Sequence, residues 1–253
     1  MSAIASSGKS ESEAYPAAGQ FNTTQWGMVV LAGQSQAPQA GEALENLCRT
    51  YWSPIYAYVR RKGHRPHDAQ DLTQEFFARL LEKKSLKLAS RERGRFRSFL
   101  LKSLQHFLVN EWVRGQSQKR GGGQAVLALD ENALEQSYQQ SMAGQLGPET
   151  VYDRRWALSL LERAMDRLGA DYAATGKREL FDRLQPLLLT EGAGASYRQE
   201  AALLGHTEGA VKVAVHRLRK RLGEGVRAEV ARTVADPADV DGELRYLMAA
   251  LNS

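Results

Sequence analysis

The spacing of apolar residues most constrains what this chain can fold into. Along most of the sequence apolar residues recur at i, i+3, i+4 and i+7, and the period-2 alternation of a half-buried strand is rare. An apolar stripe at this spacing covers one face of an α-helix, which must bury that face against a neighbouring helix. The sequence therefore predicts an all-α protein.

A polar, glycine-containing stretch separates two helical blocks. It includes the breakers KRGGG and GQLGP, and so long a connection is unusual within one compact domain. We therefore predict two helical domains joined by a flexible linker. The predicted parts are a disordered leader (1–20), a first domain (21–114), a linker (115–151), a second domain (152–230) and an acidic amphipathic extension (231–253).

Composition narrows the classes of protein to consider. Cys48 is the single cysteine of the sequence, which excludes an intramolecular disulfide and a zinc site built on thiolates. Apolar runs fall short of the roughly 18 residues of a membrane span, and the N-terminal residues do not resemble a signal peptide. We therefore expect a cytoplasmic protein that does not enter a membrane.

Catalytic motifs are not recognisable in the sequence. His64, His67 and Asp68 lie close together, but nothing completes a coordination shell around them. The three glycines at 121–123 follow no strand and lack the Lys-Ser/Thr continuation of a phosphate-binding loop. We expect a non-enzymatic protein with no metal and no cofactor.

Two capped helices follow one another in the second domain. Ser196 and Gln199 form a capping box, and Gly205 suits a left-handed helix end. Thr207 is the N-cap candidate of a next helix that runs to about Leu222. Two helices joined by such a turn form a helix-turn-helix, whose second helix lies in the DNA major groove.

The second of these helices has an apolar and a basic face. The apolar positions are Val211, Val215, Leu218 and Leu222. Between Thr207 and Leu222 there are five Lys or Arg residues and one Glu. A solvated basic face is the alternative, but the two caps and the glycine turn favour DNA binding. The DNA-contact candidates are Thr207, Lys212, Val213, His216, Arg217, Arg219 and Lys220.

The first domain carries an acidic helix followed by a basic and aromatic segment. DAQDLTQEFFARLLE holds four acids and one Arg, which fits either a solvated face or a docking face for a basic partner. The segment from Arg91 to Arg120 holds eight Lys or Arg and two Glu, with interleaved aromatic residues. Basic and aromatic side chains together bind unstacked single strands, so Trp112 and the arginines are contact candidates.

Taken in order, these motifs resemble the extracytoplasmic function (ECF) group of bacterial RNA polymerase sigma factors. DAQDLTQEFFARLL resembles the helix that docks on core polymerase, and FRSFLLKSLQHFLVNEWVR the segment that opens and reads the −10 promoter element. SYRQEAALLGHTEGAVKVAVHRLRKRL is similar to the domain that reads the −35 element. The resemblance covers roughly Phe21 to Val230 and implies that the linker threads toward the polymerase active-site cleft.

The resemblance also assigns roles to residues. The residues expected to face core RNA polymerase are Asp68, Asp71, Leu72, Gln74 and Glu75. The residues expected to meet the −10 region are Arg95, Arg97, His106, Asn110, Trp112 and Arg114. His106 and Asn110 stand where Asn and Asp are frequent in the family, so the resemblance does not assign the exact −10 contacts of this chain.

Two alternatives remain open at this level. The chain could instead be a stand-alone helix-turn-helix regulator whose N-terminal block senses a ligand or dimerises. The acidic extension either packs as an extra helix or docks on one of the two domains and tunes access to promoter or polymerase. Regulation could come from a separate partner, such as an anti-sigma protein, or from the extension of the chain itself.

Overall fold

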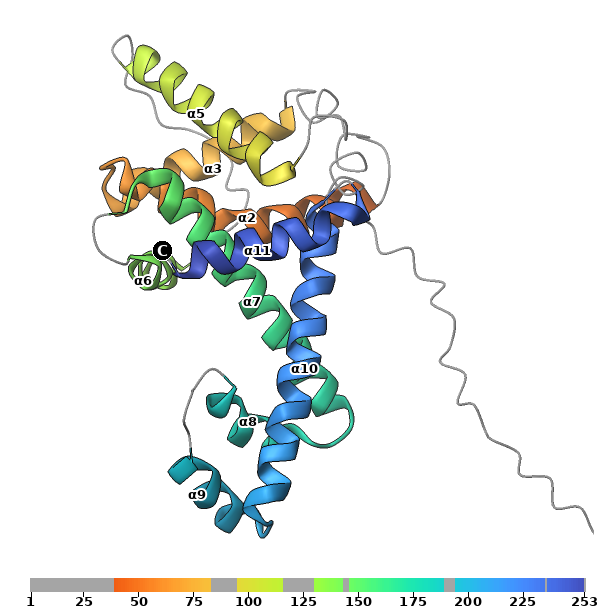
Figure 1. Ribbon diagram of the computed structural model, residues 1–253. Helices are drawn as coiled ribbons and strands as arrows, with labels where there is room; N and C mark the ends of the chain where they lie inside the picture. Colours follow the sequence, from red (N-terminus) through yellow and green to blue (C-terminus); the bar gives the residue numbers. More distant parts are fainter. Residues whose placement is uncertain are drawn as a thin grey trace, which may run out of the picture.

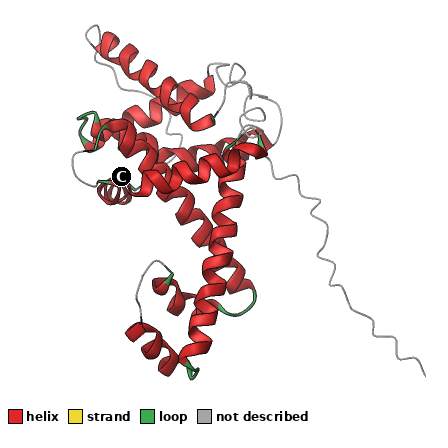
Figure 2. Cartoon of the chain, in the orientation of Figure 1, coloured by secondary structure: helices red, strands yellow, loops and turns green. Residues whose placement is uncertain are grey.

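The structure is a computed structural model that describes residues 39–82, 95–115, 130–142, 146–188, 194–234 and 236–252. Across these ranges all regular elements are helical and no strand occurs, which confirms the all-α prediction (Figure 2). The helices are α2 (Gln39–Arg61), α3 (Pro66–Glu82), α5 (Phe96–Gly115), α6 (Glu131–Ser141), α7 (Pro148–Ala174), α8 (Arg178–Leu184), η2 (Gln185–Leu187), α9 (Gly194–Leu204), α10 (Glu208–Thr233), η3 (Pro237–Asp239) and α11 (Val240–Asn252).

The helices form a larger and a smaller unit on a shared pair of long helices (Figure 1). The larger unit, here called the globule, contains α2, α3, α5, α6, α11, the first half of α7 and the last part of α10. The smaller unit, here called the tip, contains α8, η2, α9 and the remaining parts of α7 and α10. Because α7 and α10 run through both units, no flexible connection separates them along these helices.

The core of the globule is rich in aromatic rings. Trp52 of α2 stacks on Phe77 of α3 with ring centroids 5.3 Å apart, and Tyr51 meets Phe96 of α5 edge-on at 5.3 Å. These four side chains are buried, as is Cys48 one turn earlier in α2. Large buried rings dominate core energetics, so α2 is the helix around which the globule is assembled.

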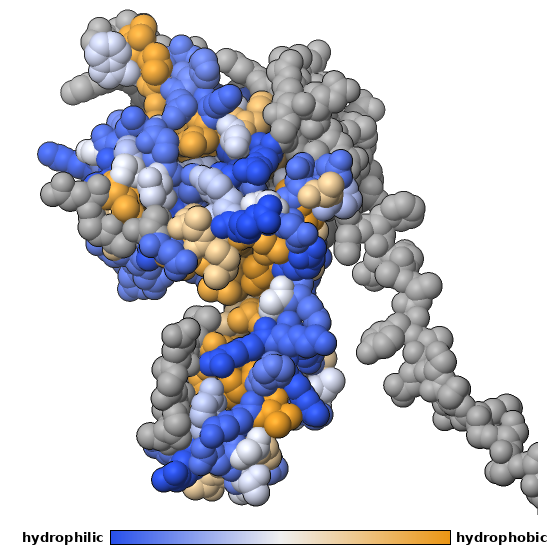
Figure 3. Space-filling view, in the orientation of Figure 1, coloured by the Kyte–Doolittle hydropathy of each residue, from blue (hydrophilic) through white to orange (hydrophobic). Residues whose placement is uncertain are grey.

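The core of the tip is smaller and aliphatic. Val211, Val215 and Leu218 of α10 pack with Phe181 and Leu184 of α8. The positions that the sequence predicted to be inward on α10, namely Val211, Val215, Leu218 and Leu222, are all buried. Apolar residues gather at the neck between the units (Figure 3), where Val226 packs against both cores.

The predicted linker differs most from the structure. Asp130 accepts a hydrogen bond from the Asn132 backbone N–H and so caps α6, a helix inside the 115–151 segment. Leu134 and Tyr138, four residues apart, are buried in the globule core. The helix is therefore docked on the globule through these two side chains together with its polar contacts to α2, so 130–142 is not flexible linker.

Two other predicted boundaries also shift. The helix expected to end near Leu222 continues to Thr233, through Gly223 and Gly225. At Gly225 an added Cβ would lie 3.5 Å from the Ala164 Cβ, an ordinary van der Waals distance, so α10 and α7 pack closely here. In α11 the apolar residues Val240, Leu244, Leu247 and Leu251 are buried or partly buried, but Met248 is 56% exposed. The predicted leader lies outside the described residues.

Candidate functional site

The acidic surface of the globule lies on α3. Ala69, Thr73, Phe76 and Phe77 point into the core, which turns the opposite face of the helix to solvent. Asp68 and Asp71 are exposed on that face. Asp71 lies 3.7 Å from His67 Nε2, one turn back, and keeps 65% of its side-chain surface in solvent. Both carboxylates are accessible to a partner.

The other residues predicted on this surface are more enclosed. Leu72, Gln74 and Glu75 are partly buried. Glu75 pairs with Arg79, and Arg79 also donates to Glu111 of α5. Glu75 therefore belongs to a bridge between α3 and α5, which gives it a structural part as well as a place near the acidic face.

A pocket of about 560 Å³ lies beside the outer end of α5, meaning the turns around Val109–Val113. Its lining comes from Tyr58, Lys62, His64, Gln105, Leu108, Val109 and Trp112. Trp112 is 68% exposed, and the Lys62 ammonium lies 5.6 Å from the centroid of the Tyr58 ring. An aromatic surface beside a cation is a combination that binds unstacked single strands, and this contact stays a prediction for the pocket.

Sequence reasoning identified Trp112 of this pocket but missed most of its lining. Tyr58, Lys62 and His64 come from α2 and the turn after it, 32 to 38 residues before the start of α5. Gln105 donates to the Tyr58 hydroxyl at 3.2 Å and joins the two sides. The basic residue Lys62 and the aromatic Tyr58, four apart, are the pattern that would have pointed to α2.

The residues predicted for the −10 region fall into separated groups. His106 and Asn110 are exposed on α5 but do not line the pocket, and Arg114 has no described side chain. Arg95 and Arg97 lie at the opposite end of the helix. Fifteen residues separate Arg97 from Trp112, which is about 22 Å along a helix. A single compact contact site does not contain all six.

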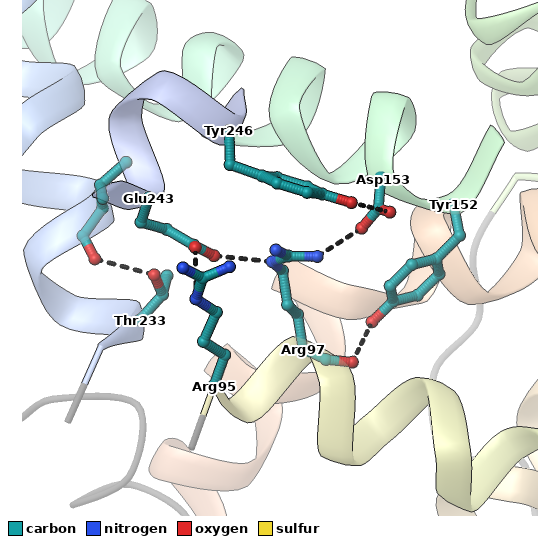
Figure 4. A network of polar contacts seen from close by, with 8 residues as sticks. Arg95, Arg97, Tyr152, Asp153, Thr233, Glu243 and Tyr246 are labelled. Atoms are coloured by element: carbon teal, nitrogen blue, oxygen red, sulfur yellow. Dashed lines mark hydrogen bonds and ion pairs between the residues drawn. The ribbon is translucent and has the colours of Figure 1, made fainter. Parts of the chain in front are cut away.

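Arg95 and Arg97 are held by the C-terminal helix (Figure 4). Arg97 is 6% exposed, and it donates to Glu243 Oε1 and to Asp153 Oδ1, each at 2.6 Å. Arg95 pairs with Glu243 Oε2 at 2.8 Å. Burial alone would lower the pKa of Arg97, but the hydrogen bond to Glu243 and the charge of Asp153 outweigh it, so its pKa is raised.

The tip presents a ridge of side chains on α10. Gly205 has φ +66 and ends α9, and the Thr207 hydroxyl accepts from the Ala210 N–H at 3.2 Å to cap α10. Beyond this turn Val213, His216, Arg217 and Lys220 are exposed at i, i+3, i+4 and i+7. They share one face, opposite the buried stripe, and Val213 is 51% exposed.

Three other residues predicted on α10 make contacts within the tip. Arg219 donates to the carbonyls of Leu187 and Leu188 at 2.8 and 3.0 Å, which satisfies the end of η2. Lys212 lies 2.7 Å from Glu208, and the hydrogen bond and charge of Lys212 lower the pKa of Glu208. The Thr207 side chain is used in the cap. These three residues flank the ridge rather than form its centre.

The described residues contain no group of His, Cys, Asp and Glu suited to hold a metal ion. Among the same residues, no helix combines the length and apolar character needed to span a membrane.

Two comparisons with known proteins find similar sequences. Residues 47–118, which include α3 and α5, match the sigma-70 region 2 family. Over 178 residues the chain is 25% identical to ECF RNA polymerase sigma factor SigE of Mycolicibacterium smegmatis (strain ATCC 700084 / mc(2)155). The match covers 70% of this chain and 59% of that relative's length, and no solved structure matches. The chain is therefore similar to RNA polymerase sigma factors of the ECF group, and the sigma-70 region 2 match lies in its N-terminal half.

Proposed function

We propose that this chain binds core RNA polymerase through the acidic face of α3 and directs it to promoters. The observation that supports this most is the position of Asp68 and Asp71. Both lie within the sigma-70 region 2 match, and both are exposed on a helix whose opposite face is fixed in the core. An exposed acidic face complements a basic docking surface.

Promoter contacts are divided between the two units. The pocket at the outer end of α5 receives an unstacked base of the −10 strand against Trp112. The ridge of Val213, His216, Arg217 and Lys220 enters the major groove at the −35 element, with Arg217 placed for a guanine edge or a phosphate. RNA synthesis is the task of the polymerase, so the chain itself is not an enzyme.

Capture of core polymerase tests the central claim. Asp71→Lys reverses a charge on the acidic face and leaves the α3 core intact. It is preferred to substitution of Glu75, which also joins α3 to α5. A matched control is Glu179→Lys on α8, because Glu179 is likewise exposed and paired at i,i+4, to Arg183 at 3.5 Å. We expect binding to core polymerase without DNA to weaken at least tenfold for Asp71→Lys and to stay unchanged for Glu179→Lys.

The outcomes separate the alternatives. If the unmodified chain does not bind core polymerase, the chain acts as a stand-alone DNA-binding regulator and the proposal fails. If Asp71→Lys binds as well as the unmodified chain, the polymerase docks on another face of the globule.

A further inference from the structure

The C-terminal helix α11 forms ion pairs with two arginines at the start of α5. Arg95 and Arg97 come from the N-terminal half of the chain, yet the carboxylate that joins them, Glu243, lies 146 residues after Arg97. Glu243 Oε1 accepts from Arg97 Nε, and Glu243 Oε2 lies 2.8 Å from Arg95 Nε. One acidic group thus bridges two guanidinium groups, as a phosphate does when two arginines bind it.

Arg97 is enclosed by side chains of α11 and α7. The Tyr246 ring lies 3.9 Å from the guanidinium carbon and covers it, and the Tyr246 hydroxyl donates to Asp153 (Figure 4). Asp153 and Trp156, both from α7, also contact the guanidinium group. Removal of α11 would therefore uncover one face of Arg97 and leave its contacts with α7 in place.

The carboxylate of Glu243 is almost fully buried. Its side chain is 1% exposed, and Oε2 makes the ion pair with Arg95 but accepts no hydrogen bond among the described residues. Burial of a charge is costly unless ion pairs and hydrogen bonds compensate for it. Glu243 thus depends on the two arginines to compensate its buried charge.

We propose that α11 covers the Arg95–Arg97 pair and that promoter DNA displaces it, with backbone phosphates replacing the Glu243 carboxylate. This rests on the proposed function, because it takes DNA as the competing ligand. With α11 in place, two arginines face Glu243 and Asp153. Once α11 has left, the same two arginines face Asp153, and the local charge becomes positive and available to a phosphate.

The test uses the full chain with Glu243→Gln, which removes the charge and keeps the size of the side chain. Asp241→Asn is the matched control: it removes the same charge from the same helix, where Asp241 pairs with Arg227 of α10. Binding to a short DNA duplex is measured by fluorescence anisotropy at low salt. We expect Glu243→Gln to bind about tenfold more tightly than the unmodified chain, and Asp241→Asn to change affinity less than twofold. Arg95→Gln combined with Glu243→Gln should cancel the gain.

A second measurement needs no substitution and covers the case in which Glu243→Gln does not fold. Saturating duplex DNA should accelerate amide hydrogen exchange across residues 240–252 of the unmodified chain. Unchanged exchange would overturn the proposal, and so would a Glu243→Gln variant that binds DNA no better than Asp241→Asn. If neither measurement gives the expected result while the chain still captures core polymerase, α11 does not cover the arginines and the proposed function is unaffected.

Discussion

Trp112 is a large apolar residue that lies on the surface instead of in the core. It keeps 68% of its surface in solvent, and its neighbours Val109 and Val113 are 62% and 54% exposed. Contiguous exposed apolar side chains on a soluble protein mark a contact surface. Since Trp112 contributes little to the core, its value to the chain lies in what it binds.

Trp112→Ala should therefore separate stability from DNA binding. Stacking of a base on an aromatic ring contributes roughly 1–3 kcal/mol, so we expect at least a fivefold loss of affinity for a single-stranded −10 oligonucleotide. The measurement uses the complex with core polymerase. The melting temperature of the free chain should stay within about 2 °C, because the ring is largely solvated. Met248→Ala, which removes another exposed apolar side chain, should leave both values unchanged. An unaltered oligonucleotide affinity for Trp112→Ala would exclude the pocket as the base site.

At the scale of an element, α6 shows how a helix in a polar segment is held in place. Arg60 donates to both oxygens of Glu135 at 2.9 and 2.8 Å, and the Tyr56 hydroxyl donates at 2.8 Å. The Ser53 and Ser137 hydroxyls are 2.8 Å apart. The hydrogen bond from Arg60 lowers the pKa of Glu135 from 4.5 to about 2, with a smaller contribution from Tyr56 and against the effect of burial.

This pKa gives a pH dependence with a definite sign. A carboxyl whose pKa is lower in the folded chain stabilises it fully above the unfolded pKa, and loses that contribution as pH falls toward the folded pKa. Glu135→Gln should therefore cost about 1 kcal/mol of unfolding free energy near neutral pH, since the pair is partly solvated. The difference from the unmodified chain should shrink below about pH 4.5. Denaturant unfolding at several pH values measures it, and a difference that is constant down to pH 3 would contradict the assignment.

Elements with local signals could be predicted, and those fixed by distant partners could not. The Thr207 cap, the Gly205 turn and the buried stripe from Val211 to Leu222 depend on residues within a few turns of each other. Docking of α6 depends on Arg60, 75 residues earlier than Glu135. The sequence predicted Arg97 to contact DNA. Its partner Glu243 lies 146 residues later, and no local pattern shows that the two meet.

At the scale of the whole molecule, α7 and α10 make the two units mechanically continuous. Each helix contributes to both cores, and Glu229 of α10, 2% exposed, pairs with Arg163 and Arg167 of α7 at 3.3 Å. Under the proposed function, these two helices therefore set how the pocket beside Trp112 and the ridge on α10 lie relative to each other.

Continuity of α7 and α10 predicts cooperative unfolding. Leu218→Ala opens a cavity in the tip and should destabilise the chain by roughly 2–5 kcal/mol. Trp52 and Trp156 are buried in the globule, so their fluorescence reports on the globule, while the substitution is in the tip. We expect the fluorescence and circular dichroism midpoints to fall together in denaturant. An early circular dichroism transition with an unshifted fluorescence midpoint would instead identify the tip as an independent folding unit.

The reactivity of the Cys48 thiol reports on how tightly α2 is packed. It is the single cysteine of the sequence, and its side chain is fully buried beside Tyr51 and Trp52. A buried thiol reacts with an alkylating reagent only when its surroundings open. The rate at which Cys48 is alkylated in the chain without substitutions therefore measures how often the globule opens. Polymerase and DNA, added one at a time, would each reveal through that rate whether they loosen or tighten the core.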